Sequence, residues 1–275
     1  MGSMTESKTS SETSIFDSEP PINLAYGSGI FRRRIRLTSG DGWVFGELED
    51  SSHAFKVRLV FDADCIVGVA PETIRYPMTT CPTAVNPLRA IIGMPLGLSA
   101  SELAKQLMPR LQCTHLFDLS VLAYQHIHRT ASVRVYDIQI PDETEAKLPR
   151  PLEVFQDGQR VLSWMVRDWQ IFEPIALAGH TLRSGFSKWL EALYPEDEQQ
   201  KEWAWLAQKG YLVSQARMFD INRLGGTRKF VGDHMVGICH TYSEAQIHNA
   251  EHTHHSFIDF TDNAAELLAF KPLER

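Results

Sequence analysis

Two cysteines hold the positions in this sequence that point most directly to chemistry. Cys81 precedes Pro82, and Cys113 precedes a stretch in which apolar residues recur with helical spacing, so we expect both thiols at helix starts. A helix N-terminus carries partial positive charge, which lowers the pKa of a thiol and favours the thiolate. The sequence therefore predicts a pair of reactive or ligating thiols. A buried thiol in the core is the alternative for either cysteine taken alone.

A histidine and an aspartate follow Cys113 at a spacing that makes them neighbours on a helix. His115 and Asp118 are three residues apart. A carboxylate beside an imidazole can hold the ring in one tautomer, as the orienting group of a catalytic array does. We interpret His115 as a general acid or base and Asp118 as the residue that orients it, with His53, before a predicted strand, as a further candidate. A simple helix-surface pair is the alternative.

A histidine-rich run near the C-terminus is the other place where a metal could bind. It contains His248, Glu251, His252, His254 and His255. Glu251 does not directly follow the first histidine, so the run departs from the His-Glu-x-x-His zinc motif, and we predict a solvated loop or an exposed helix end. The sequence contains no Gly-x-Gly-x-x-Gly or Walker pattern, so we expect no organic cofactor.

The elements that must position these residues change in type along the chain. Alternating segments joined by short turns predict an antiparallel meander over 31–37, 43–48, 54–61 and 65–76. Helices are predicted at 82–92, 102–108 and 113–128. Further strands are expected at 133–138, 152–155 and 161–166, and further helices at 182–193, 196–218 and 263–270. The fold class is therefore α+β.

These elements divide the chain into three parts. Residues 1–28 lack apolar periodicity, and we expect them to be disordered. Residues 29–130 form an α+β core of a meander sheet packed with helices. Residues 131–275 form a strand hairpin and a helical extension packed on that core.

Composition and charge exclude several classes of protein. The chain has 275 residues, 43% of them hydrophobic, and a formal net charge of −7. It has no broad basic stripe, which argues against a nucleic-acid partner, and Arg32, Arg33 and Arg34 are expected on a solvated strand edge. No run approaches the roughly 18 apolar residues of a membrane span, and the polar N-terminus does not resemble a secretory signal. We expect a cytoplasmic protein with free thiols and no membrane partner; a homodimer is compatible with the sequence.

The segment from Phe55 to Ile127 resembles the iron–sulfur cluster assembly scaffolds of the NifU/SufE type. In those proteins a meander of strands ends in a cysteine that opens a helix, and a later helix opens with another cysteine. The resemblance implies that Cys81 and Cys113 meet at one end of the sheet, with His53 on the neighbouring loop. The scaffold's first cysteine falls near Ser51, so a mixed Cys/His zinc site is the metal-binding alternative.

A second resemblance covers the chain from about residue 30 and is to a bacterial domain family of unknown function. The residues that carry it are the Arg33–Arg36 run, Glu49-Asp50 with His53, Cys81-Pro82, and Gln-Cys-Thr-His-Leu-Phe-Asp-Leu over 112–119. Segments 179–186 and 237–242 are also similar to this family. The resemblance implies a role in the catabolism of aromatic or other hydrophobic compounds.

Three functions follow as hypotheses. The first is a cofactor-independent enzyme that performs lyase- or isomerase-like proton transfer on a small hydrophobic, aromatic metabolite, with His115 as acid or base and the two cysteines binding or polarising the substrate. The second is a zinc-binding or iron–sulfur-handling module using Cys81, Cys113 and His53 or His115. The third is a non-catalytic protein that binds hydrophobic ligands.

Overall fold

A computed structural model describes residues 21–227 and 235–272. Eight strands form one antiparallel sheet in the order β4-β3-β2-β1-β5-β6-β7-β8. Their bounds are β1 Ile30–Gly40, β2 Trp43–Asp50, β3 Ala54–Phe61, β4 Ile66–Arg75, β5 Val133–Pro141, β6 Arg150–Gln156, β7 Gln159–Arg167 and β8 Gln170–Glu173. Together with the helices, this sheet confirms the α+β class. The meander predicted from 31 to 76 is β1–β4, whereas β8 was not expected from the sequence.

The strand β1 is central, because β5 pairs with it on the side opposite β2. The strands after residue 131 therefore extend the same sheet as the meander. Alternate β1 residues, including Phe31, Arg33 and Ile35, are buried, while Arg32 and Arg34 point to the other face. The expectation that the three arginines lie on a solvated edge is wrong, since an interior strand buries every second side chain.

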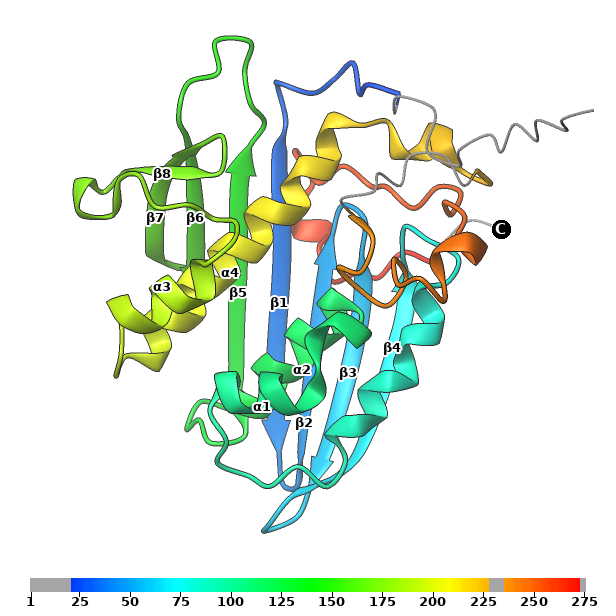
Figure 1. Ribbon diagram of the computed structural model, residues 1–275, viewed down its shortest axis with the longest axis vertical. Helices are drawn as coiled ribbons and strands as arrows, with labels where there is room; N and C mark the ends of the chain where they lie inside the picture. Colours follow the sequence, from blue (N-terminus) through cyan, green and yellow to red (C-terminus); the bar gives the residue numbers. More distant parts are fainter. Residues whose placement is uncertain (1–20, 228–234, 273–275) are drawn as a thin grey trace, which may run out of the picture.

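Four α-helices cover one face of the sheet (Figure 1). They are α1 Ala100–Leu107, α2 Thr114–His126, α3 Phe186–Leu193 and α4 Glu198–Ser214. α2 packs on β2 and β3, and α4 packs on β5 and β6. The sequence Ser-Ala-Ser-Glu over 99–102 predicts a capping box, and it is present: Ser99 and Glu102 exchange side-chain-to-backbone hydrogen bonds at the start of α1. The described residues also form the 3-10 turns η1 Cys81–Val85, η2 Pro87–Ile91, η3 Pro109–Leu111, η4 Ile175–Leu177, η5 Gln215–Met218, η6 Ile221–Leu224, η8 Ile247–Asn249 and η9 Ala264–Glu266.

Two predicted helices are corrected. The helix expected at 82–92 is the pair η1 and η2, because Pro87 lacks the N–H that a continuous helix needs at that point. The helix expected at 263–270 is only η9. Beyond it, the backbone N–H groups of Leu268 and Phe270 donate to Glu49 Oε2 instead of continuing a helix. This segment, red in Figure 1, passes behind the sheet, on the face that the four helices leave open.

The ends of the described chain pack on the fold. Of the N-terminal segment expected to be disordered, residues 1–20 lie outside the described residues; Ile22 forms a bridge with Phe219, and Asn23 N donates to Met218 O. The sequence also predicts a loop over 225–231, of which residues 228–231 lie outside the described residues. In the described ranges no helix is long and apolar enough to cross a membrane.

Candidate functional site

A tight turn between β2 and β3 brings Asp50 and His53 together. Asp50 N donates to His53 O, and Asp50 Oδ1 accepts from the backbone N–H groups of Ser52 (2.8 Å) and His53 (2.9 Å). Aspartate favours such turns because its side chain can bond the backbone two residues on. The same oxygen lies 2.9 Å from His53 Nδ1. Since a carboxylate can only accept, Nδ1 carries the proton and Nε2 bears the lone pair when the ring is neutral.

Arg33 holds Asp50 from the neighbouring strand. The two residues are direct partners in the β1–β2 register. Arg33 Nε and Nη2 donate to Asp50 Oδ2 at 2.9 and 2.6 Å, and both side chains are buried. Burial acts to raise the pKa of Asp50, but the nearby charges of His53 and Arg33 and the hydrogen bond from His53 hold that pKa well below its usual range. Asp50 is therefore a fixed negative charge beside His53.

The first turn of α2 places His115 against His53. Their rings are stacked, with centroids 3.6 Å apart and an interplanar angle of 22°. His115 Nε2 is buried, and no hydrogen-bond partner reaches it from the described residues. Burial, with the nearby His53 and Arg33, holds the pKa of His115 well below its usual range, so this ring is neutral near pH 7.

Asp118 does not orient His115. Within the described residues, neither of its buried carboxylate oxygens has a hydrogen-bond partner, and Lys209 of α4 forms a longer ion pair with it, with Nζ 3.6 Å from Oδ1. Burial raises the pKa of Asp118, and Lys209 and Arg33 partly oppose that rise. The group that holds a histidine in this site is Asp50, and the histidine held is His53.

The two predicted thiols come together with a third. Cys113 is the N-cap residue of α2, Cys81 opens η1, and the Cys81 and Cys239 thiols are close enough to raise the pKa of Cys113. Thr241 Oγ1 donates to Cys81 Sγ at 3.4 Å. Burial raises the pKa of Cys81 to about 11 and that of Cys113 further. The expectation of low-pKa thiols is therefore wrong, because enclosure of the sulfurs outweighs the helix starts.

A buried arginine ties the turn to the rest of the molecule. Arg75, at the end of β4, donates to the backbone carbonyls of Asp50, Ser51 and Ser256. It also forms an ion pair with Glu49 at 3.0 Å. The backbone around Asp50 and His53 is thus fixed from two strands and from the C-terminal segment.

One group of side chains in the described part of the chain has the spacing of a metal site. Ligand atoms of Asp50, His53 and His115, one from each, all lie within 4.8 Å of one another. No cysteine belongs to this group. The C-terminal histidine run does not supply another such group within the residues the structure describes.

An apolar cleft lies among the helices that cover the sheet, and none of the site residues described above lines it. It encloses about 200 Å³ between α1, α2, α3 and α4, and its lining includes Phe117, Val121 and Trp205. The Lys209 amino group lies 5.5 Å from the centre of the Trp205 ring. Lys209 therefore stands between a wall of the cleft and Asp118.

Asp50, Arg33 and Lys209 were not identified as site residues from the sequence. An Asp-Ser-Ser-His run at the junction of two predicted strands is a signal for a turn stabilised by its aspartate, and it could have identified Asp50. Identifying Arg33 requires the exact β1–β2 register, and identifying Lys209 requires the packing of α4 on α2. No local sequence pattern predicts that register or that packing.

One comparison with known proteins matches the part of the chain that holds most of this site. A family described as "Protein of unknown function (DUF2889)" matches residues 43–128, which are under a third of the chain. Arg33 and Lys209 lie outside the match. The site residues within it are Asp50, His53, Cys81, Cys113, His115 and Asp118. No curated protein matches the chain.

Proposed function

We propose that this protein is an enzyme that moves protons on a small hydrophobic substrate without an organic cofactor, with His53 as the general base. The observation that carries the proposal is the bond between Asp50 Oδ1 and His53 Nδ1, because it directs the basic Nε2 away from Asp50. Asp50 stabilises the imidazolium that forms when His53 takes a proton. Arg33 keeps Asp50 ionised during the transfer.

His115 serves as the second group of the reaction. A neutral imidazole next to the base can donate a hydrogen bond to the oxyanion that develops when a carbon acid loses its proton. The depressed pKa of His115 keeps it in that neutral form. Cys81 and Cys113, as neutral thiols, contribute packing and weak hydrogen bonds instead of a nucleophile.

The apolar cleft supports a hydrophobic substrate. Pockets for small molecules combine apolar walls with placed polar groups, and this lining holds both, with Phe117 and Trp205 beside charged residues such as Lys201 and Glu202. Lys209 lies beyond Trp205. We propose that the aromatic ring of the substrate packs against Trp205 and that a substrate oxygen faces Lys209. The reaction class is an isomerisation or elimination that begins with proton abstraction next to a carbonyl.

The test is deuterium exchange in heavy water. Aryl ketones and aryl-substituted 2-oxo acids are incubated with the protein, and loss of the proton signal next to the carbonyl is followed by NMR. We expect exchange with the wild-type protein and a rate lower by about 10²- to 10⁴-fold with His53→Gln, as for loss of a general base. His128→Gln, at an exposed histidine, is the matched control and should exchange at the wild-type rate.

Two results would contradict the proposal. One is the absence of catalysed exchange across the set of carbon acids. The other is exchange by His53→Gln at the wild-type rate, which would place the base elsewhere. Thermal melting of each variant establishes that the comparison is between folded proteins.

A metal-binding role is the second candidate, favoured by the spacing of Asp50, His53 and His115. These are ligand types that zinc and iron accept. Asp50 Oδ1 already accepts bonds from Ser52 and His53, which disfavours it as a ligand. Stoichiometric metal in protein purified without added metal, lost in His115→Phe, would replace the proton-transfer proposal with this one.

A further inference from the structure

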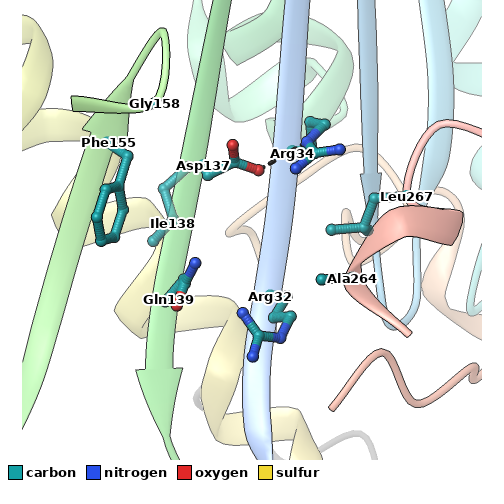
Figure 2. Close-up of a pocket in the computed structure, with 9 residues that line it drawn as sticks. All are labelled: Arg32, Arg34, Asp137, Ile138, Gln139, Phe155, Gly158, Ala264 and Leu267. Carbon is teal, nitrogen blue, oxygen red and sulfur yellow. Dashed lines mark hydrogen bonds and ion pairs between the residues drawn. The ribbon is translucent and has the colours of Figure 1, made fainter. Parts of the chain in front are cut away.

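A second hollow lies on the face of the sheet that the four helices leave open (Figure 2). It encloses about 210 Å³ between β1, β5, β6 and the C-terminal segment. Arg32 and Arg34 of β1 lie on its floor with Asp137 and Gln139 of β5. The sheet itself separates the hollow from the histidine site, so binding in the hollow is independent of the proposed function.

One positive charge in this hollow has no negative partner. Along β1, Arg33 pairs with Asp50, Arg34 with Asp137 and Arg36 with Glu47. Arg32 differs: its Nε donates to the backbone carbonyl of Thr261 at 3.3 Å, and in the described part of the chain no carboxylate lies within ion-pair distance of it. The hollow therefore holds two guanidinium groups and one carboxylate, with a net positive charge.

Both arginines enter the hollow from the same face of β1. Arg32 and Arg34 are two residues apart on one strand, so their side chains leave the same face about 7 Å apart. The hydrogen bond of Arg34 to Asp137 engages Nε, and that of Arg32 to Thr261 also engages Nε. Their terminal amino groups are the donors that a carboxylate accepts from in paired, charge-assisted bonds.

The sides of the hollow are apolar. Phe155, the register partner of Asp137 on β6, presents its ring on one side, and Ala264 and Leu267 form the other. The second wall is held in place, because the backbone N–H groups that follow Leu267 donate to Glu49. A ligand in this hollow therefore contacts charged side chains on the floor and apolar side chains on both sides.

We propose that this hollow binds a small aromatic carboxylate, with its carboxylate on Arg32 and Arg34 and its ring between Phe155 and Leu267. The volume supports a ligand of this size, since pockets for drug-sized molecules begin near 300 Å³. A carboxylate is a better match than a neutral aromatic compound, because it balances the unpaired charge of Arg32.

The test is titration calorimetry with benzoate on the full chain. We expect saturable binding of one benzoate, and affinity at least about tenfold lower for Arg32→Gln, which loses charge-assisted bonds. Arg58→Gln is the matched control, because Arg58 is exposed on the same face of the sheet but lies outside the hollow. It should bind benzoate with the wild-type affinity.

Two further ligands separate the parts of the proposal. Benzamide keeps the ring without the charge, and acetate keeps the carboxylate without the ring; both should bind at least about tenfold more weakly than benzoate. Failure of the wild-type protein to bind benzoate, or equal binding by Arg32→Gln with an unchanged melting temperature, would overturn the proposal. Equal affinity for benzamide would overturn the role of the charge, and equal affinity for acetate would overturn the role of the ring.

Discussion

Asp50 connects three residues of the site through its two oxygens. Oδ2 accepts from Arg33, and Oδ1 accepts from Ser52 and from both the backbone and the ring of His53. Burial of an unpaired carboxylate is costly, so these bonds are what keep the group ionised inside the protein. At the scale of single residues, the histidine site therefore depends on the Arg33–Asp50 pair.

Removing the Asp50 charge should be strongly destabilising. Asp50→Asn leaves Arg33 buried without a carboxylate, and we expect the free energy of unfolding to fall by about 3–5 kcal/mol. Asp137→Asn is the matched control: it breaks the Arg34 pair, in which both side chains are partly exposed, and should cost about 0–1 kcal/mol. Urea unfolding of the two variants measures both values. Equal losses of unfolding free energy in the two variants would show that burial does not make the Arg33–Asp50 pair more important than the Arg34–Asp137 pair.

The depressed pKa of His115 makes stability depend on pH. Above the unfolded-state value of about 6.5, the ring is neutral in both states and adds no pH dependence. As the pH falls below that value, the unfolded chain binds a proton that the folded protein excludes, so the free energy of unfolding decreases, by up to about 1.4 kcal/mol per pH unit. His115→Phe, which keeps a ring against His53, should flatten this slope between pH 6.5 and 5.5.

Urea unfolding at several pH values measures the slope. Burial also lowers the pKa values of His126 and His240, so the wild-type slope has several sources and the difference between the two proteins is the quantity to compare. His128→Gln is the control and should leave the slope unchanged. An identical slope in His115→Phe would mean that His115 titrates normally in the folded protein.

Helix α4 reaches the site because it packs unusually close to the sheet. Gly210 faces β5, where an added methyl group would lie 2.5 Å from Ile138 Cγ2. The adjacent residue is Lys209, which approaches Asp118. The sequence predicted a helix over 196–218, and α4 with η5 confirms it. Its distance from the sheet could not be predicted, because a glycine within a helical pattern does not indicate what it faces.

Gly210→Ala should separate α4 from β5. The added methyl group forces a shift of the helix or of Ile138, and we expect a loss of about 1–3 kcal/mol in the free energy of unfolding despite the better helix propensity of alanine. Leu212→Ala, at a largely exposed position of the same helix, should stay within about 0.5 kcal/mol of the wild type. Chemical denaturation compares the two, and a more stable Gly210→Ala protein would contradict the close packing.

At the scale of the whole molecule, one sheet separates two regions of different chemistry. The helix-covered face holds the histidines, the thiols and the apolar cleft, and the open face holds Arg32 and Arg34 (Figures 1 and 2). Local signals predicted β1–β7 and, through the capping box, α1, whereas the short strand β8 was not predicted. Alternation alone could not show that β5 joins β1, and that pairing is what makes β1 central.

The same limit applies to the site. Cys81, Cys113, His115, Asp118 and His53 were candidates because of their types and local spacing. Their partners, Arg33 and Lys209, come from elements distant in sequence, and the direction of the thiol pKa values depends on burial, which helix position does not reveal. Contacts between distant elements could not be predicted from local patterns.

The tautomer of His53 decides whether this ring can act as the base that Asp50 orients. Nitrogen-15 NMR of protein labelled at histidine, recorded at pH 8 and assigned with His53→Gln, distinguishes a protonated ring nitrogen from a bare one. We predict a proton on Nδ1, toward Asp50, and a lone pair on Nε2. A bare Nδ1 in the neutral ring, as in the opposite tautomer or a metal complex at that atom, would contradict this role.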